Sequence, residues 1–470
     1  MIPVKAAKRG PREPSARWQC RGRVLRAYEL SKGTEGGTQM PRTSSPRLRQ
    51  IAQVAAENKE FVFRNLAHLI DEELLHEAYS RTSGSAAAGI DQMTKREYGE
   101  RLATRLRDLH QRLVSQTYRA TPSRRGYVPK DGGTMRPIAL PVFEDKLVQR
   151  ATVLLLQEVY EQDFYPFSYG FRPGRNPHQA LVELRQQCAA KNIGWIVDAD
   201  IKGFFDNLDR TVLQDLLHRR VKDGGIDRLI GKWFAAGILE GKELLHPETG
   251  TPQGSVVSPM LANIYLHHAL DEWFAEVAQR HLKGRSFLIR YADDFVIGCE
   301  LEADAQKMLR VLPLRLAKYG LEIHPEKTRL VRFRRPSSRD DGSGNGTFDF
   351  LGLTHYWGKT RRGGWLVKRK TAKKRLARAI RAAYVWCRFH RHDPLPQQHR
   401  ILSSKLRGHY RYYGVRNNFP CLRRLYQQVK EAWRKWLGRR SRASYISYER
   451  MDRLLIRYPL PKPRIMHDFG

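Results

Sequence analysis

The chain predicts an α+β fold, in which a sheet backed by helices is followed by a basic helical region. Short apolar runs with strand character alternate with helical patterns between residues 126 and 355. Apolar residues at helical spacing precede this region, and a basic helical pattern follows it. We therefore divide the chain into a basic flexible arm (1–45), a helical N-terminal extension (46–125), the sheet region (126–355), a basic helical region (359–440) and a basic tail (441–470).

The composition is that of a globular protein. The chain has 470 residues, of which 41% are hydrophobic and 10% aromatic, so it can bury a large core in two or three domains. The five cysteines are far apart and form no CxxC pair, which favours reduced thiols over a disulfide framework or a zinc site. No apolar run approaches the ~18 residues of a spanning helix, so we expect a cytoplasmic protein without a membrane partner.

Positive charge is concentrated at the C-terminal end of the chain. Residues 51–358 carry 42 basic and 40 acidic side chains, whereas residues 359–470 carry 31 basic and 5 acidic ones. The first 50 residues add 12 basic and 3 acidic side chains, to give a formal net charge of +37. A segment this basic that also contains aromatic residues is typical of a polyanion binder, and nucleic acid is the leading partner.

The N-terminal half predicts helices followed by a hairpin. Apolar residues recur at helical spacing from residue 47 to residue 118, with a break at Ser83-Gly84-Ser85. Strand-forming residues then flank an Asp-Gly-Gly turn in the segment 126–138, which predicts a β-hairpin. A helix is expected from Phe143 to Tyr160.

Carboxylates stand at the ends of two predicted strands. The apolar strand 195–201 carries Asp200 near its end, and the segment 286–299 predicts a β-hairpin with Asp293 and Asp294 at its tip. Like charges ~4 Å apart repel by roughly 4 kcal/mol at an effective dielectric of about 20, so such a cluster requires protons or cations. Magnesium suits these hard oxygen ligands. A polar turn without chemistry is the alternative interpretation of the Asp-Asp pair.

Later segments complete the pattern of elements. Glycine and proline in the segment 250–259 predict a loop before an apolar helix at 261–270, and small residues there allow backbone to approach a ligand. After a polar loop at 337–346, the segment 348–353 predicts a short strand. Residues 370–391 then predict a helix with one apolar and one basic face.

In this order, the strand with Asp200, the Pro-Gln-Gly loop and the Tyr-Ala-Asp-Asp hairpin resemble the palm of reverse transcriptases. The resemblance is closest to the maturase reverse transcriptases of bacterial group II introns and covers residues 60–465. Each motif alone is weak, but the ordered set is specific. It implies a right-hand polymerase whose fingers and palm form an antiparallel sheet backed by helices, followed by an α-helical thumb. The matching segments are 130–137, 168–175, 200–207, 251–259, 291–294, 320–328, 350–352 and 405–414.

The resemblance also implies a catalytic site. Asp200, Asp293 and Asp294 would be catalytic and, with the backbone carbonyl of Ile201, would hold two Mg²⁺ ions. The residues expected to contact the incoming deoxynucleotide are Lys130 and Arg136 at the triphosphate, Gln253 near the sugar and base, Phe205 against a 2′-hydroxyl, and Lys327 near the leaving pyrophosphate. For Phe205, a place in the apolar core remains the alternative.

Further residues are expected to contact nucleic acid. Arg172 and Arg175 would contact phosphates, and Gly352 would let the backbone approach the primer strand. In the thumb, Tyr410 and Tyr412 alternate with Arg407 and Arg411, a mixture that can stack on unpaired bases and pair with phosphates. The alternative is that the tyrosines pack the thumb's own helices.

The resulting prediction is an RNA-directed DNA polymerase that uses an RNA template, a DNA primer and dNTPs, and that binds group II intron RNA to promote splicing and mobility. Two other functions stay open: a related polymerase co-opted for repair or defence, and a splicing factor whose polymerase is unused. Without a paired-cysteine zinc site, no HNH endonuclease is expected. The sequence predicts no oligomeric state, cognate RNA or DNA target.

Overall fold

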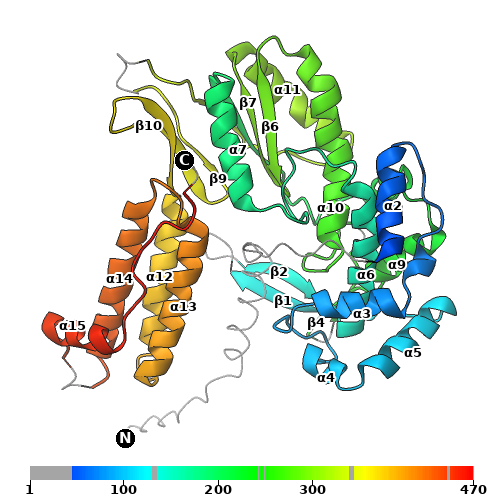
Figure 1. Cartoon of the computed structure of the whole chain (residues 1–470), viewed down its shortest axis with the longest axis horizontal. Helices are drawn as coiled ribbons and strands as arrows, with labels where there is room; N and C mark the ends of the chain where they lie inside the picture. The colour runs from blue at the N-terminus through cyan, green and yellow to red at the C-terminus, as the bar shows by residue number, and fades with distance from the viewer. Residues whose placement is uncertain are drawn as a thin grey trace, which may run out of the picture.

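The computed structural model describes residues 45–129, 135–241, 243–247, 249–337, 343–441 and 445–468. A sheet region backed by helices is followed by a helical bundle, as the sequence predicts (Figure 1). The sheet region consists of three separate sheets. The expected basic arm, residues 1–45, lies outside the described residues except for Ser45.

The N-terminal extension is helical and packs on the long helix α6 (Phe143–Tyr160). Its helices begin where the sequence provides caps: the Asp71 carboxylate accepts from the Leu74 amide, and Thr94 and Glu97 form a capping box. Buried leucines such as Leu75 and Leu109 join the main core. The helices are α2 (Pro46–Glu57), α3 (Glu72–Arg81), α4 (Lys95–Gly99) and α5 (Leu102–Val114).

The first sheet contains the predicted hairpin. Strands β1 (Ser123–Pro129) and β2 (Met135–Leu140) pair antiparallel, with Arg136 opposite Val128. The short strands β4 (Ile238–Glu240) and β5 (Glu243–Leu245) extend this sheet in the order β2-β1-β4-β5, and the β1 and β4 strands run parallel. The helix α6 (Phe143–Tyr160) follows β2 in the chain and has the bounds that the sequence predicts.

The second sheet, in the order β6-β7-β3-β8, is antiparallel throughout and carries the predicted carboxylates. Apolar side chains alternate between its two faces, since Val197 and Phe295 join one core and Ile196 and Val296 join the other. A sheet buried on both faces gives a rigid base to the residues at its end. Its strands are β3 (Trp195–Asp200), β6 (Ser286–Tyr291), β7 (Asp294–Cys299) and β8 (Arg329–Arg332).

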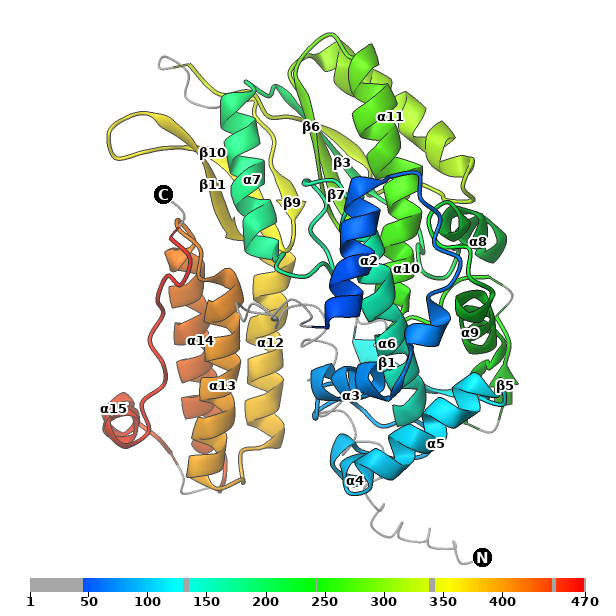
Figure 2. The same ribbon diagram turned by 45° about the vertical axis from the view of Figure 1, so that its right-hand side comes forward.

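Helices cover both faces of this central sheet (Figure 2). One face of the sheet lies against the main core, to which most of the covering helices contribute. On the other face, α7 (Pro177–Ala190) packs on β6 and reaches β11 (Trp365–Thr371) of the third sheet. The apolar helix predicted after the glycine-rich loop begins at Ser258 and passes into π-helical turns at 267–271 and 274–278. The remaining helices are α7 (Pro177–Ala190), α8 (Arg210–His218), α9 (Gly224–Ala235), α10 (Ser258–Leu266) and α11 (Glu302–Ala317).

A third, three-stranded sheet leads into the C-terminal helices. Strands β9 (Phe348–Phe350), β10 (Leu353–Lys359) and β11 (Trp365–Thr371) pair antiparallel. Three long helices then stand side by side around a separate core that includes Leu402 and Trp433 (Figures 1 and 2). They are α12 (Lys373–Phe389), α13 (Leu395–Tyr413) and α14 (Phe419–Leu437), and the shorter α15 (Tyr448–Arg457) follows.

The C-terminal region contains a strand and a helix beyond those predicted. Within the expected region 359–440, residues 365–371 form a strand that pairs with β10, and the first helix begins at Lys373, close to the helix predicted from residue 370. The expected tail, 441–470, also contains α15 and packs on the bundle: Met451 and Leu460 are buried in its core, and His467 bridges to Val415.

Other sequence expectations concern membranes and thiols. Throughout the described parts of the chain, every helix is too short or too polar to span a bilayer. Cys188, Cys299 and Cys387 are buried free thiols and Cys421 is a half-buried one, whereas Cys20 lies outside the described residues. The reduced thiols predicted from the spacing are thus found at these four positions.

Candidate active site

The predicted hairpin has a tight, two-residue turn. Strands β6 and β7 pair Tyr291 with Asp294, and Ala292 and Asp293 form the turn between them. Ala292 has a φ of 57°, in the left-handed region that a side chain seldom adopts. Backbone strain of this kind is retained only where the surroundings enforce it, and it is concentrated at functional sites.

The structure brings the predicted carboxylates to one end of the central sheet. Asp200 lies directly opposite Asp294 in the β3–β7 ladder, and such cross-strand pairs have Cβ atoms about 4.5–5.5 Å apart. Asp293 lies one residue before Asp294, in the turn. Asp294 is exposed, while Asp200 and Asp293 are half-buried. The three side chains are therefore accessible to a ligand and lie at the same end of the sheet.

A lysine already compensates part of this negative charge. The Lys327 ammonium lies 2.7 Å from the Asp200 carboxylate, and both side chains are about half exposed. The neighbouring Asp198, two residues earlier on β3, pairs instead with Arg329 at 3.1 Å. Burial raises the pKa of Asp198, and Arg329 opposes that rise. Lys327 thus lies beside the carboxylate cluster, as its predicted role requires, whereas Asp198 is engaged elsewhere.

Ile201 follows Asp200 and forms an isolated antiparallel bridge with Ile323. This bridge brings the 320–328 segment to the end of β3, since the His324 amide donates to the Asp200 carbonyl at 2.8 Å. The side chain of Ile201 is buried, so the residue can offer only its backbone carbonyl to the site.

The loop 250–258 joins the first sheet to the carboxylate end of the second. The Gln253 carbonyl accepts from the Ala139 amide of β2 at 2.6 Å, and the Thr251 amide donates to the Phe205 carbonyl at 2.8 Å. Gly254 has a φ of 106°, and a Cβ there would lie 2.7 Å from the Ala139 carbonyl oxygen. Glycine is therefore required for this close approach. Gln253 is half-buried beside β2.

Phe204 and Phe205 have different surroundings. Phe204 is buried in the main core, whereas Phe205 is half-buried and packs edge-on against Phe204 with ring centroids 5.2 Å apart. The segment forms a turn and not an extended strand, but the two side chains still separate into an interior one and a partly exposed one. Phe205 contacts the core without being enclosed by it.

Of the two predicted triphosphate ligands, the structure describes only Arg136. Arg136 lies near the start of β2 and is half-buried. Lys130 lies outside the described residues, between the two strands of the hairpin.

The prediction that Arg172 contacts nucleic acid is not supported by its surroundings. Its side chain is 4% exposed and forms a bidentate ion pair with Glu161 at 3.0–3.1 Å. It also donates to the carbonyls of Tyr165 and Ser168. A guanidinium enclosed in this way has no nitrogen for a phosphate. Arg175 is half-buried and lies over the Tyr169 ring.

Gly352 lies in a second tight turn, between β9 and β10. Both turn residues have positive φ, 51° at Leu351 and 74° at Gly352, as a type I′ hairpin requires. A Cβ at Gly352 would lie 2.9 Å from the Tyr413 hydroxyl of α13. The glycine thus allows the C-terminal bundle to approach this turn closely.

The predicted thumb residues divide into interior and exposed positions. Tyr410 is buried and donates to the Pro461 carbonyl at 3.1 Å, and Tyr412 donates to the Leu351 carbonyl at 2.9 Å. Tyr410 thus packs the bundle, and the half-buried Tyr412 ties the bundle to the β9–β10 turn, as the alternative interpretation of the tyrosines expects. Contact with nucleic acid stays a prediction for both residues. Arg407 and Arg411 are exposed on the same helix. Of these four residues, only the arginines present charge to solvent.

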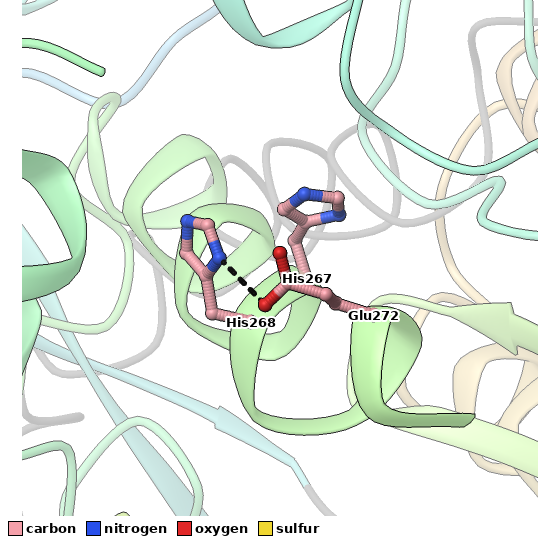
Figure 3. Close-up of side chains that lie close together, drawn as sticks. All are labelled: His267, His268 and Glu272. Carbon is pink, nitrogen blue, oxygen red and sulfur yellow. Dashed lines mark hydrogen bonds and ion pairs between the residues drawn. The ribbon is translucent and has the colours of Figure 1, made fainter. Parts of the chain in front are cut away.

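A cluster that the sequence analysis missed lies on the π-helical turn after α10. His267, His268 and Glu272 bring ligand atoms within 4.8 Å of one another, and His268 contacts Glu272 at 3.3 Å (Figure 3). Burial lowers the pKa of His267 to about 3, so that ring is neutral. The Arg219 guanidinium, however, lies 3.3 Å from Glu272 and 3.4 Å from His268. A cation already compensates the carboxylate, and we assign no metal here.

Residues not predicted from the sequence support the β6–β7 hairpin from below. Arg290 and Asp271 form a fully buried ion pair beneath the turn, and Asn263 and Gly170 contact the same network. Arg290 directly precedes the Tyr-Ala-Asp-Asp motif, and a charged residue inside an otherwise apolar strand was the signal available in the sequence.

Comparison with known proteins identifies related sequences. The sequence model of the family "Reverse transcriptase (RNA-dependent DNA polymerase)" matches residues 128–355. The chain is 32% identical to Protein YkfC of Escherichia coli K12 over 283 residues, which are 53% of this chain and 74% of YkfC. It is 35% identical to the group II intron-encoded protein LtrA of Lactococcus lactis subsp. cremoris over 238 residues, half of this chain and 39% of LtrA.

A third relative, the mitochondrial nuclear intron maturase 1 of Arabidopsis thaliana, is 33% identical over 90 residues, which are 19% of this chain and 12% of that protein. The match to YkfC covers more than two thirds of that relative, whereas the matches to LtrA and to the maturase cover much less than two thirds of theirs. The first sheet and the central sheet both lie largely within the matched residues 128–355.

Proposed function

The chain belongs to the reverse transcriptase family of RNA-dependent DNA polymerases, and from that premise we propose that it extends a DNA primer on an RNA template by two-metal nucleotidyl transfer. The observation that carries this proposal is the grouping of Asp200, Asp293 and Asp294 at one accessible end of a rigid sheet. A strained turn that presents a carboxylate fits a site organised for catalysis.

The donor set suits magnesium. Carboxylates and a backbone carbonyl are hard oxygen ligands, and the accessible side of the cluster leaves space for substrate phosphates. Asp200 and Asp293 would be the principal ligands, with Asp294 and the Ile201 carbonyl as further donors. When bound, two Mg²⁺ ions would stabilise the attacking and leaving oxygens of the phosphoryl transfer.

The chain's own residues would bind and orient the nucleotide. Lys130 and Arg136 of the β1–β2 hairpin would hold the triphosphate, and Gln253, docked on β2, would contact the sugar and base. The part-exposed ring of Phe205 would exclude a 2′-hydroxyl. Positioning of this kind and charge stabilisation supply most of the catalysis in phosphoryl transfer.

Lys327 would act on the leaving group. Its ammonium pairs with Asp200 in the described structure and lies on a turn, so it can exchange this partner for a phosphate oxygen. There it would neutralise the developing charge of pyrophosphate or donate a proton to it.

We further propose that the basic C-terminal bundle binds structured RNA, and that this RNA is a group II intron whose splicing and mobility the protein promotes. The exposed Arg407 and Arg411 and the excess of 31 basic over 5 acidic residues after position 358 support an RNA-binding role. Arg175 and Gly352 would contact phosphates and primer. The intron assignment rests on the likeness to LtrA and to the maturase, and the proposed location is the cytoplasm.

A co-opted polymerase that acts in repair or defence remains a second candidate, since most of LtrA lies outside its match to this chain. Primer extension with dNTPs and magnesium on an RNA template tests the polymerase proposal for both candidates. We expect the wild type to synthesise DNA and the Asp293→Ala variant to lose synthesis while it retains RNA binding. A folded wild type that binds RNA but makes no DNA would leave only the splicing-factor function.

A further inference from the structure

Arg290 is a buried cation directly beneath the catalytic turn. It lies on β6, three residues before Asp293, and its side chain is fully buried together with that of Asp271. The Arg290 guanidinium forms two hydrogen bonds with the Asp271 carboxylate, at 2.8 and 2.5 Å. Burial raises the pKa of Asp271, and the Arg290 charge opposes that rise. The pair is thus stable only as a unit.

The remaining guanidinium nitrogen of Arg290 contacts the turn itself. Nη1 donates to the Ala292 carbonyl at 3.1 Å and to the Asn263 side-chain oxygen at 3.0 Å. Ala292 is the turn residue with a φ of 57°. The planar guanidinium of arginine donates to the Asp271 carboxylate and to the Ala292 carbonyl at the same time. A lysine ammonium cannot make these hydrogen bonds with the same geometry.

Asn263 and Gly170 fix the turn from a second direction. The side-chain amide nitrogen of Asn263 donates to the Gly170 carbonyl at 2.7 Å. A Cβ at Gly170 would clash with the backbone nitrogen of Ala292, so the two backbones are in close contact. The backbone of Arg290 is also paired, since its amide donates to Phe167 and its carbonyl accepts from Tyr169.

We infer that Arg290 is a positioning residue: anchored by Asp271 and Asn263, it holds the Ala292 carbonyl and so fixes the Asp293 carboxylate in the orientation needed to bind metal. This inference rests on the proposed function. A displacement of about 1 Å at a reacting group can reduce a rate by about 100-fold, so the anchor would act on turnover although it touches no substrate. The alternative is an ion pair that only stabilises the fold.

An apolar replacement separates these two roles. Arg290→Met with Asp271→Leu removes the whole ion pair without leaving an unpaired buried charge, an exchange that proteins often tolerate. The matched control is Arg285→Gln with Glu300→Gln, which removes the exposed ion pair, 2.9 Å long, at the other end of the same hairpin. Arg290→Lys keeps a positive charge opposite Asp271 but lacks the planar guanidinium that also reaches the Ala292 carbonyl. This variant replaces the double variant if the double variant does not fold.

The measurements are kcat, the KM for dNTP, template–primer affinity, the thermal midpoint, and the affinity for Mn²⁺ in a complex with a dideoxy-terminated primer. We expect kcat to fall at least tenfold and Mn²⁺ affinity severalfold in a folded variant, with unchanged template–primer affinity, and no change in the control pair. A folded variant with wild-type kcat and Mn²⁺ affinity would overturn the inference. A wild type that makes no DNA would instead overturn the proposed function.

Discussion

The central sheet and the C-terminal bundle use charge in opposite ways. Residues 51–358 carry nearly equal numbers of basic and acidic side chains, and key charges there form specific pairs such as Arg290–Asp271 and Arg172–Glu161. Residues 359–470 carry 31 basic against 5 acidic side chains, so most of their cations cannot have an acidic partner within that segment. Specific ion pairs of the first kind fix geometry, whereas a net positive charge of the second kind favours binding of a polyanion.

Because of this difference, chemistry and binding should be separable by mutation. Substitutions at the end of the central sheet should impair DNA synthesis and spare RNA affinity. Substitutions of exposed arginines on the bundle should do the reverse.

The largest effect is expected for Asp200→Asn. It removes a charge from the proposed metal site, which should reduce DNA synthesis by about 1,000-fold or more, since metal coordination is worth several kcal/mol and each 1.36 kcal/mol is about tenfold in rate. Primer extension checks the rate, and filter binding checks RNA affinity, which should stay within about twofold of the wild type. Synthesis at the wild-type rate would exclude Asp200 from the site.

Lys327→Gln should have the next largest effect. If the Lys327 ammonium acts on the leaving group, its loss should reduce single-turnover incorporation by about 100-fold, the lower end of general acid catalysis. Lys202→Gln is the control, because Lys202 is an exposed lysine near the same site and pairs with Glu322 at 2.9 Å. Equal rates for the two variants would show that Lys327 contributes only surface charge.

Phe205→Val should relax the choice of sugar. A smaller side chain would admit a 2′-hydroxyl, so the preference for dNTP over NTP should fall about tenfold or more, the scale of steric discrimination in a pocket. Phe205→Tyr keeps the bulk and serves as the control. The measurement is the ratio of kcat/KM for dGTP and GTP. An unchanged ratio in Phe205→Val would favour the core role of this ring.

Arg407→Gln with Arg411→Gln tests the opposite side of the comparison. Removal of two exposed charges should weaken RNA binding. It should also make the negative slope of the logarithm of the RNA association constant against log salt concentration less steep, by about one for each phosphate that is no longer neutralised. Extension at saturating template–primer should keep the wild-type rate. Arg285→Gln with Lys202→Gln removes the same charge from the palm region and should leave the salt dependence unchanged. A palm variant with an equally reduced slope would contradict a localised binding surface.

The smallest effect is expected for Tyr410→Phe. The Tyr410 hydroxyl donates to the Pro461 carbonyl, so its removal should lower the free energy of unfolding by about 1 kcal/mol and leave RNA affinity unchanged. Denaturant unfolding and filter binding measure the two quantities. Reduced RNA affinity without reduced stability would restore Tyr410 as a ligand of RNA.

The sequence predicted what is set locally. The β6–β7 hairpin with Asp293 in its turn, the hairpin of the first sheet, and α6 all follow from patterns within about 20 residues. The grouping of Asp200 with Asp293 and Asp294 was predicted only from the ordered motifs, and its ladder pairing with Asp294 was not predicted, because the two residues are 94 positions apart and no local pattern reveals such pairing.

The partners of buried polar groups could not be predicted. The sequence shows that Arg172 is basic, but not that Glu161 and two backbone carbonyls enclose it. Similarly, Tyr410 and Tyr412 are of a residue type that is common on RNA-binding surfaces, yet their hydroxyls donate hydrogen bonds to backbone carbonyls 51 and 61 residues away. Such contacts depend on how elements pack, which periodicity does not specify.

The most direct test of the central claim is to count bound metal without turnover. Mn²⁺ binding to the wild type and to Asp293→Ala can be measured by electron paramagnetic resonance, in a complex with RNA template, dideoxy-terminated DNA primer and dNTP. We predict two Mn²⁺ ions per wild-type complex and the loss of at least one in the variant, with equal template–primer affinity. The same Mn²⁺ stoichiometry and affinity in both proteins would contradict a metal site built on the hairpin.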